Sequence, residues 1–182
     1  MNSDFDKKVI FVGGIHGVGK TTLCEEISKK ISLKHYSASE LISNLKSENI
    51  TKNKEVSNVR ENQNILLESV DRYLNNEEYY LLDGHFCLLN RDENIVEVPF
   101  NTFRLLGLKA IIVLVDHESQ ILKRLVDRDA KSYSIDFMKE FQKKEIYYAK
   151  EVAIRIGVRY KVINKTSDVN ETLEFITSII NK

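Results

Sequence analysis

Short apolar runs alternate with long amphipathic stretches along this chain, and this alternation most limits the folds it can adopt. Runs rich in β-branched or aromatic residues predict strands at 9–13, 33–36, 79–83, 110–115 and 159–163. Helical periodicity predicts helices at about 19–31, 38–47, 55–76, 117–130, 134–156 and 168–181. Strands that alternate with helices form parallel sheets, because parallel strands need crossover connections. We therefore predict a three-layer α/β/α fold around a five-stranded parallel sheet.

Length and charge narrow the possible functions. The 182 residues suit one domain spanning 1–182. Lys and Arg number 27, as do Asp and Glu, so zero net charge argues against a general DNA or membrane-surface binder. Cys24 and Cys87 form no CxxC pair, and we predict that both are buried hydrophobes. The first apolar run, about six residues, is too short for a signal sequence or membrane span, which favours a cytoplasmic protein.

A glycine cluster follows the first predicted strand. Four of the seven glycines fall between residues 13 and 19, and Gly14 to Thr21 match the pattern GxxxxGK[ST]. Such glycines let backbone N–H groups form an anion nest, to which the following helix adds its dipole. Lys20 can reach the β- and γ-phosphates of a nucleotide, and the Thr21 hydroxyl can ligate Mg²⁺. We predict an ATP and Mg²⁺ site formed by Gly14, Ile15, His16, Gly17, Val18, Gly19, Lys20, Thr21 and Thr22.

Histidines and a second acidic residue accompany this loop. His16 either frames the phosphates or occupies a variable position of the motif. Asp83 ends the third predicted strand, where a P-loop fold presents an acidic residue to Mg²⁺ or its waters, so Thr21 and Asp83 form the predicted metal site. A plain Asp-Gly turn is the alternative. His85 is a candidate general acid or base, a group that orients Asp83, or a substrate contact. We expect surface or capping positions for two other histidines, His35 and His117.

Arg124 and Arg128 lie four residues apart and therefore on one face of a predicted helix. A planar guanidinium suits the charge that spreads over a transferring phosphoryl group. The alternative is a solvated helix face with neighbouring aspartates as partners. Arg155 and Arg159 have the same spacing without an evident role.

Together these motifs resemble the small P-loop nucleoside monophosphate kinases, most closely the archaeal-type adenylate kinases and their nuclear adenylate-kinase-like relatives. The resemblance spans nearly the whole chain. It implies an acceptor-binding segment at about 36–76 and a lid at about 124–138, whose Arg124 and Arg128 clamp the phosphoryl group. Lys20 and Asp83 complete the catalytic set that it implies. The motifs that carry it are GGIHGVGKTT at 13–22, YSASEL at 36–41, DGH at 83–85 and ILKRLVDRD at 121–129.

The acceptor segment departs from that family. Many adenylate kinases have a Thr-Gly pair followed shortly by Arg after the second strand, and no Arg stands near Ser37 here. The nearest candidate clamp is Arg60, although a basic side chain that covers an apolar face is the alternative. Glu145 falls on the apolar stripe of its predicted helix and needs a partner there, such as a lid arginine. The expected acceptor-binding residues are Ser37, Ser39, Arg60, Gln63 and His85.

The leading hypothesis is phosphoryl transfer from Mg·ATP to a nucleoside monophosphate, with AMP as the first choice of acceptor. One alternative is a P-loop kinase of another small acceptor. Another is an ATP-binding switch or assembly ATPase with slow hydrolysis, which would have a protein or RNA partner. P-loop folds host all three, so the sequence leaves them open.

Overall fold

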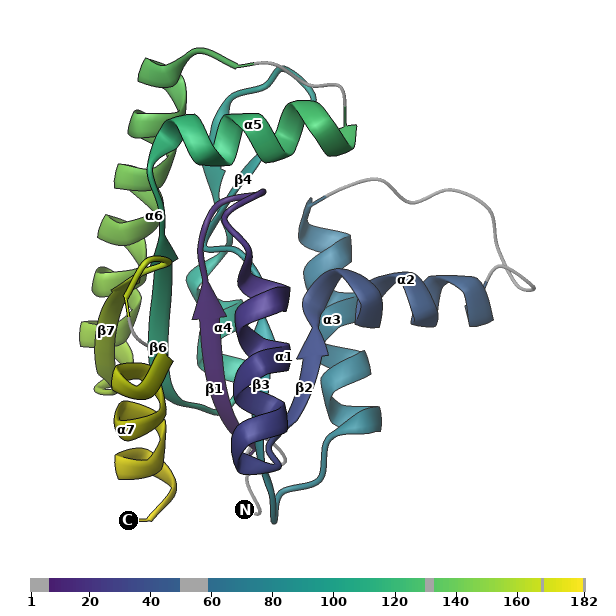
Figure 1. The fold of residues 1–182 in the computed structure, drawn as a ribbon. Helices are drawn as coiled ribbons and strands as arrows, with labels where there is room; N and C mark the ends of the chain where they lie inside the picture. The colour runs from purple at the N-terminus through teal and green to yellow at the C-terminus, as the bar shows by residue number, and fades with distance from the viewer. Residues whose placement is uncertain (1–6, 50–58, 130–132, 168, 182) are drawn as a thin grey trace.

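The computed structural model describes residues 7–49, 59–129, 133–167 and 169–181. Its centre is a five-stranded sheet in the order β2-β3-β1-β6-β7, and each neighbouring pair is parallel. The arrows of β1, β2 and β6 point the same way in Figure 1, and because every neighbouring pair is parallel, the carboxyl ends of all five strands meet at one edge. The prediction of a five-stranded parallel sheet is confirmed. The strands are β1 (Lys8–Gly13), β2 (Lys34–Ser37), β3 (Tyr79–Asp83), β6 (Leu108–Val115) and β7 (Arg159–Asn164).

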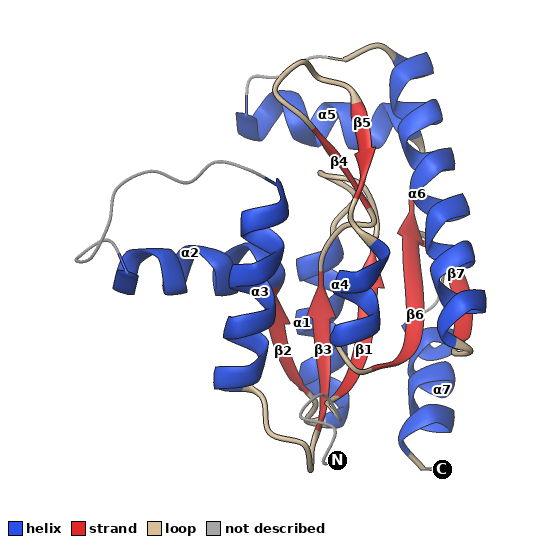
Figure 2. Cartoon of the chain, turned by 180° about the vertical axis from the view of Figure 1, so that it is seen from behind, coloured by secondary structure: helices blue, strands red, loops and turns tan. Residues whose placement is uncertain are grey.

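Helices cover both faces of this sheet. α1 and α7 lie on the face toward the viewer in Figure 1, whereas α3, α4 and α6 lie on the face seen in Figure 2. Because both faces are covered, β1 and β6 are almost entirely buried, as their continuous apolar runs predict. The helices are α1 (Lys20–Ile31), α2 (Ala38–Asn49), α3 (Val59–Tyr73), α4 (Phe100–Leu105), α5 (Glu118–Asp129), α6 (Ile135–Ile156) and α7 (Val169–Ile180).

Three short elements between β3 and β6 escaped the sequence prediction. β4 (Cys87–Leu89) and β5 (Ile95–Glu97) pair as an antiparallel hairpin, and α4 follows Pro99. Strands of three residues and a helix of six are too short to show a recognisable period. They matter because Phe103 of α4 stacks on Phe86 with ring centroids 4.7 Å apart. This contact supports the chain that leaves β3.

The burial of the cysteines agrees with the sequence prediction. Cys24 and Cys87 are free thiols with no exposed surface. Burial, the largest cause, raises the pKa of the Cys87 thiol to about 12 and raises that of Cys24 well above its ordinary value. Both thiols are therefore protonated and pack as small hydrophobes. Within the described ranges, no helix combines the length and apolarity that crossing a membrane requires.

Candidate functional site

The glycine-rich loop runs between the end of β1 at Gly13 and the start of α1 at Lys20. Its backbone needs glycine at Gly14, which has φ +146°, because a Cβ there would lie 2.7 Å from the carbonyl oxygen of Leu114. The N–H of Val18 donates to the carbonyl of Ile15 at 3.3 Å and closes a turn within the loop. The sequence therefore folds here as the predicted turn from strand to helix.

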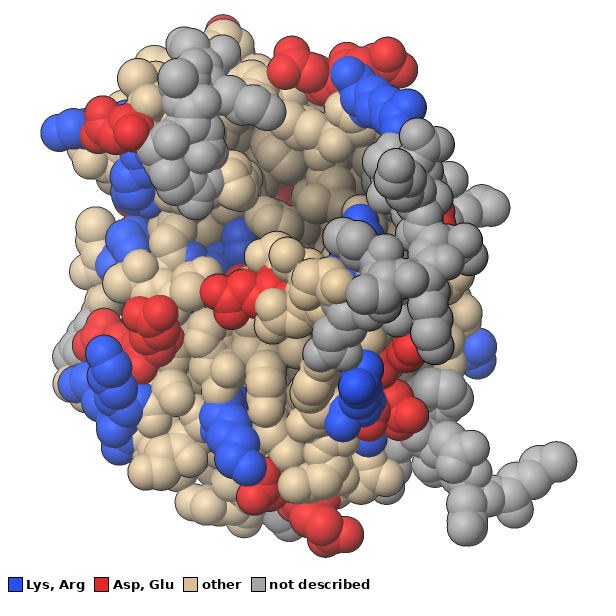
Figure 3. All heavy atoms as spheres, turned by 90° about the vertical axis from the view of Figure 1, so that its right-hand side faces the viewer, with Lys and Arg blue, Asp and Glu red and all other residues tan. Residues whose placement is uncertain are grey.

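Lys20 folds back over this loop. Its side chain is buried, and its Nζ donates to the carbonyl oxygens of Gly14 at 2.8 Å and Ile15 at 3.3 Å. A cavity of about 450 Å³ opens in front of it, and the surface seen from the α2 side is hollowed, with basic and acidic atoms visible inside the hollow (Figure 3). The lining of this cavity includes His16, Gly17, Gly19, Lys20, Thr21, Thr22, Asp83 and Arg124.

Asp83 lies beside the loop because β3 pairs with β1, which sets Asp83 opposite Val12. Its carboxylate Oδ2 accepts a hydrogen bond from Thr21 Oγ1 at 3.3 Å, and its Oδ1 accepts one from Ser37 Oγ at 3.4 Å. The structure thus brings together the two predicted metal ligands, although they are 62 residues apart in the chain. Hydroxyl and carboxylate oxygens next to a phosphate-binding loop fit the preference of Mg²⁺ for oxygen donors.

His35 was predicted at the surface or in a cap, and this prediction is wrong. Its side chain is only 11% exposed, and its Nε2 lies 2.7 Å from Asp83 Oδ2. The sulfur of Cys24 is close enough that ligand-type atoms of all three residues lie within 4.8 Å of one another. The hydrogen bond to Asp83 accounts for the close approach of the His35 side chain. His117 is exposed just before α5, as predicted.

Arg124 donates hydrogen bonds to the backbone of the phosphate-binding loop. One of its guanidinium nitrogens donates to the carbonyls of Gly17 at 2.7 Å and Val18 at 3.1 Å. The other forms an ion pair with the buried carboxylate of Asp116. Asp116 is therefore the acidic partner of Arg124. The guanidinium group of Arg124 contacts two loop carbonyls and one carboxylate at the same time. The side chain of Arg128, its predicted companion, lies outside the described residues, so its role stays a prediction.

A second cavity, of about 330 Å³, adjoins the first and contains most of the predicted acceptor residues. Four of the five line it: Ser37, Ser39, Gln63 and His85. The side chain of Arg60, the fifth, lies outside the part of the chain that the structure describes. Asn62 and Thr102 also line the cavity and were not predicted, Thr102 because it lies on the unpredicted α4.

His85 stands where the two cavities meet. Burial, assisted by the charges of Lys20 and His16, lowers the pKa of its imidazole well below the usual value. The side chain is therefore neutral near pH 7. Its Nδ1 and the Oδ1 of Asn62 are buried atoms without a hydrogen-bond partner. Both residues line the same cavity, so a ligand there could satisfy these atoms.

Glu145 lies on the buried face of α6, as predicted, but its expected arginine partner is not what it contacts. Its carboxylate accepts hydrogen bonds from three backbone N–H groups, those of Gly14, Phe86 and Cys87. The prediction missed them because such donors depend on loop conformation and leave no trace in residue type.

Comparison with known families agrees with this geometry. The family model of the AAA domain matches residues 13–142, from the phosphate-binding loop into α6. The chain belongs to the AAA domain family. A search of curated protein sequences finds no match for this AAA domain protein.

Two solved structures share the fold. A gluconokinase from Sinorhizobium meliloti 1021 is 15% identical with a TM-score of 0.54, and 97% of this chain and 95% of that chain are covered. A shikimate kinase from Bacteroides thetaiotaomicron is 15% identical with a TM-score of 0.58, with 97% and 99% covered. The AAA domain protein therefore has the three-layer α/β/α P-loop NTPase fold, which confirms the fold prediction.

Proposed function

We propose that this AAA domain protein is a P-loop phosphotransferase that transfers the terminal phosphoryl group of ATP to a small acceptor. The observation that carries the proposal is the junction of two cavities. One contains Lys20 and Thr21, the other contains Gln63, and Asp83 lines both. Phosphoryl transfer needs a donor phosphate and an acceptor side by side and little covalent chemistry from the protein.

The residues of the donor cavity have separable roles in this reaction. Lys20, held over the loop by Gly14 and Ile15, supplies positive charge to the phosphate oxygens as charge develops on them. Arg124 fixes the backbone of the loop that cradles the phosphates. Thr21 and Asp83 would hold Mg²⁺. When bound, that ion neutralises the charge of the phosphate groups.

For the acceptor we propose a nucleoside monophosphate, with AMP as the first choice. This choice is supported by the motifs that resemble adenylate kinases. It is also supported by the amide of Gln63 and the neutral imidazole of His85, which can hydrogen-bond the edge of a base. Arg60 remains the proposed clamp for the acceptor phosphate.

A second candidate acceptor is a small polyhydroxylated molecule. It is favoured by the hydroxyl and amide groups that line the acceptor cavity, those of Ser37, Asn62 and Thr102. The two structural neighbours, a gluconokinase and a shikimate kinase, are named for acceptors of this kind, which also favours this candidate.

The experiment that separates these candidates is an acceptor panel. Purified protein with Mg·ATP is given AMP, the other nucleoside monophosphates, gluconate or shikimate, and ADP formation and phosphorylated products are measured. We expect AMP to raise ADP formation at least about tenfold over ATP alone, since the bound acceptor replaces water at the transferring group. A response to gluconate or shikimate selects the second candidate. Slow ATP hydrolysis that no acceptor changes would contradict the kinase and support an ATP-dependent switch.

Arg124→Lys tests whether the hydrogen bonds from Arg124 to the loop backbone are needed for activity. Lysine keeps the charge and the helix propensity but cannot reach two loop carbonyls and Asp116 together. We expect kcat/KM for ATP to fall about 10- to 100-fold in steady-state assays. Arg155→Lys is the matched control, because Arg155 pairs with Glu151 on the exposed side of α6. Equal kinetics for the two variants would contradict the role of Arg124.

A further inference from the structure

Two side chains of α6 hold opposite ends of the phosphate-binding loop. Glu145 has no exposed surface, and its Oε1 accepts from the N–H of Gly14 at 2.9 Å and from that of Phe86 at 2.9 Å. Its Oε2 accepts from the N–H of Cys87 at 2.6 Å. One carboxylate therefore joins the start of the loop to the chain that leaves β3, although 131 residues separate Gly14 from Glu145.

The second side chain, Gln142, lies one turn earlier on α6. Its Oε1 accepts from the N–H of Asp116 at 3.1 Å, and its Nε2 donates to the carbonyl of Asp116 at 3.0 Å. Asp116 in turn pairs with Arg124, which donates to the carbonyls of Gly17 and Val18. The far end of the loop is thus linked to the same helix through two further side chains.

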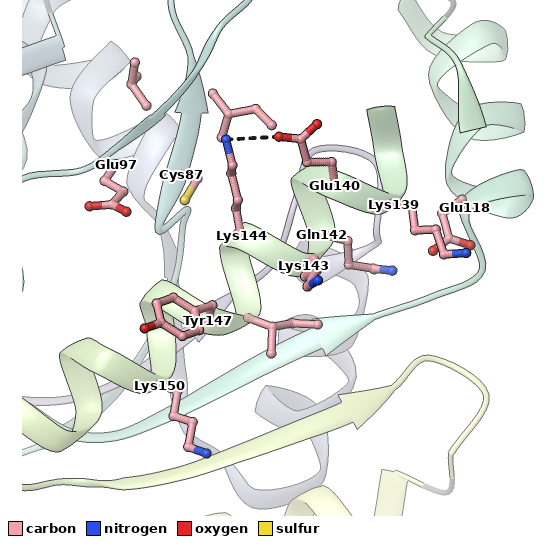
Figure 4. Close-up of a pocket in the computed structure, with 13 residues that line it drawn as sticks. Cys87, Glu97, Glu118, Lys139, Glu140, Gln142, Lys143, Lys144, Tyr147 and Lys150 are labelled. Carbon is pink, nitrogen blue, oxygen red and sulfur yellow. Dashed lines mark ion pairs between the residues drawn. The ribbon is translucent and has the colours of Figure 1, made fainter. Parts of the chain in front are cut away.

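The outer side of α6 has a different character. Figure 4 shows charged side chains that line a separate cavity of about 1060 Å³. There Glu140 forms an exposed ion pair with Lys144 at 3.1 Å, drawn as a dashed line. Exposed pairs of this kind contribute little to stability. Glu140 and Glu145 are therefore acids on one helix with opposite surroundings, and Glu140 provides a matched control.

We propose that Glu145 is a positioning residue of the nucleotide site, which fixes the first turn of the phosphate-binding loop against α6 and the chain after β3. A full carboxylate is needed because three donors share two oxygens. Glutamine would keep one oxygen and place an NH₂ group against a backbone N–H, so at least one donor would lose its acceptor. The proposal rests on the proposed function, since it assumes that this loop binds ATP.

The burial of the Glu145 carboxyl group agrees with a positioning role. Burial raises the pKa of its carboxyl group, while the N–H donors and the charge of Lys20 act in the opposite direction. A buried acid of this kind is costly unless its hydrogen bonds are complete. The conformation of the loop at Gly14 therefore depends on Glu145 keeping all three of its backbone hydrogen bonds.

The test compares ATP affinity in Glu145→Gln and Glu140→Gln by isothermal titration calorimetry with Mg·ATP. We expect the Kd of Glu145→Gln to rise about tenfold or more, because hydrogen bonds to a buried charge are among the stronger ones in proteins. Glu140→Gln should stay within twofold of the wild type. An unchanged Kd in Glu145→Gln overturns the proposal. Should that variant not fold, Glu145→Asp replaces it, which keeps the charge but shortens the reach.

Val152→Ala separates positioning from general destabilisation. Val152 is fully buried on the same helix, and the substitution removes core packing and so lowers the stability of the fold. We expect its melting temperature to fall while its ATP Kd stays within twofold of the wild type. A loss of affinity equal to that of Glu145→Gln would overturn the proposal. Wild-type protein that binds ATP but phosphorylates no acceptor contradicts the proposed function alone, because the affinities of the variants still decide the role of Glu145.

Discussion

Lys20→Ala is expected to reduce kcat at least about 100-fold while leaving the fold intact, because the substitution removes a preorganised positive charge from the phosphate site. The side chain lies over the loop and lines the donor cavity, so its loss removes the hydrogen bonds to the carbonyls of Gly14 and Ile15 together with the charge at the cavity. Steady-state kinetics with saturating ATP and acceptor measure the effect, and circular dichroism checks the fold.

The matched control for this prediction is Lys29→Ala. Lys29 is an exposed lysine in the last turn of α1, the helix that Lys20 begins, and it faces solvent far along the helix from the loop. Its substitution should leave kcat unchanged. A Lys20→Ala variant with turnover within threefold of the wild type would contradict the assignment of the loop as the phosphate site.

The sheet could be predicted from the sequence because its signals are local. The strands around Ile10 and Ile112 are short continuous apolar runs rich in β-branched residues, which is typical of parallel strands covered on both faces. The phosphate-binding loop has the same advantage, since its glycines, Lys20 and Thr21 stand in one short segment. The position of Asp83 could also be predicted from the sequence, because in P-loop folds the strand that it ends lies next to the strand before the loop.

The supports of the site could not be predicted, because they join residues that are distant in the chain. His35 meets Asp83 across 48 residues, and Arg124 meets the loop carbonyls across more than 100. Neither contact has a periodic signal, since each depends on how separate elements of the fold come together. Glu145 shows the limit most clearly: its burial followed from the helical stripe, but its backbone partners required the folded loops.

Asp83→Asn is expected to lower kcat at least about 100-fold and to move the dependence of activity on Mg²⁺ to higher concentration. Asparagine keeps the volume but removes the negative charge. It also replaces one acceptor oxygen with an NH₂ group, so it cannot accept from both His35 and Ser37 in the present arrangement. Titration of Mg²⁺ at fixed ATP measures the midpoint.

The Mg²⁺ midpoint makes this prediction specific, because misfolding would lower activity at every Mg²⁺ concentration alike. Asp71→Asn is the control: it removes a carboxylate that is 66% exposed on α3, where it pairs with Lys7. That variant should keep both kcat and the midpoint of the wild type. If Asp83→Asn also kept the wild-type midpoint, Asp83 would be only the residue that ends β3, and the oxygen donors beside the phosphate-binding loop would have to come from elsewhere in the donor cavity.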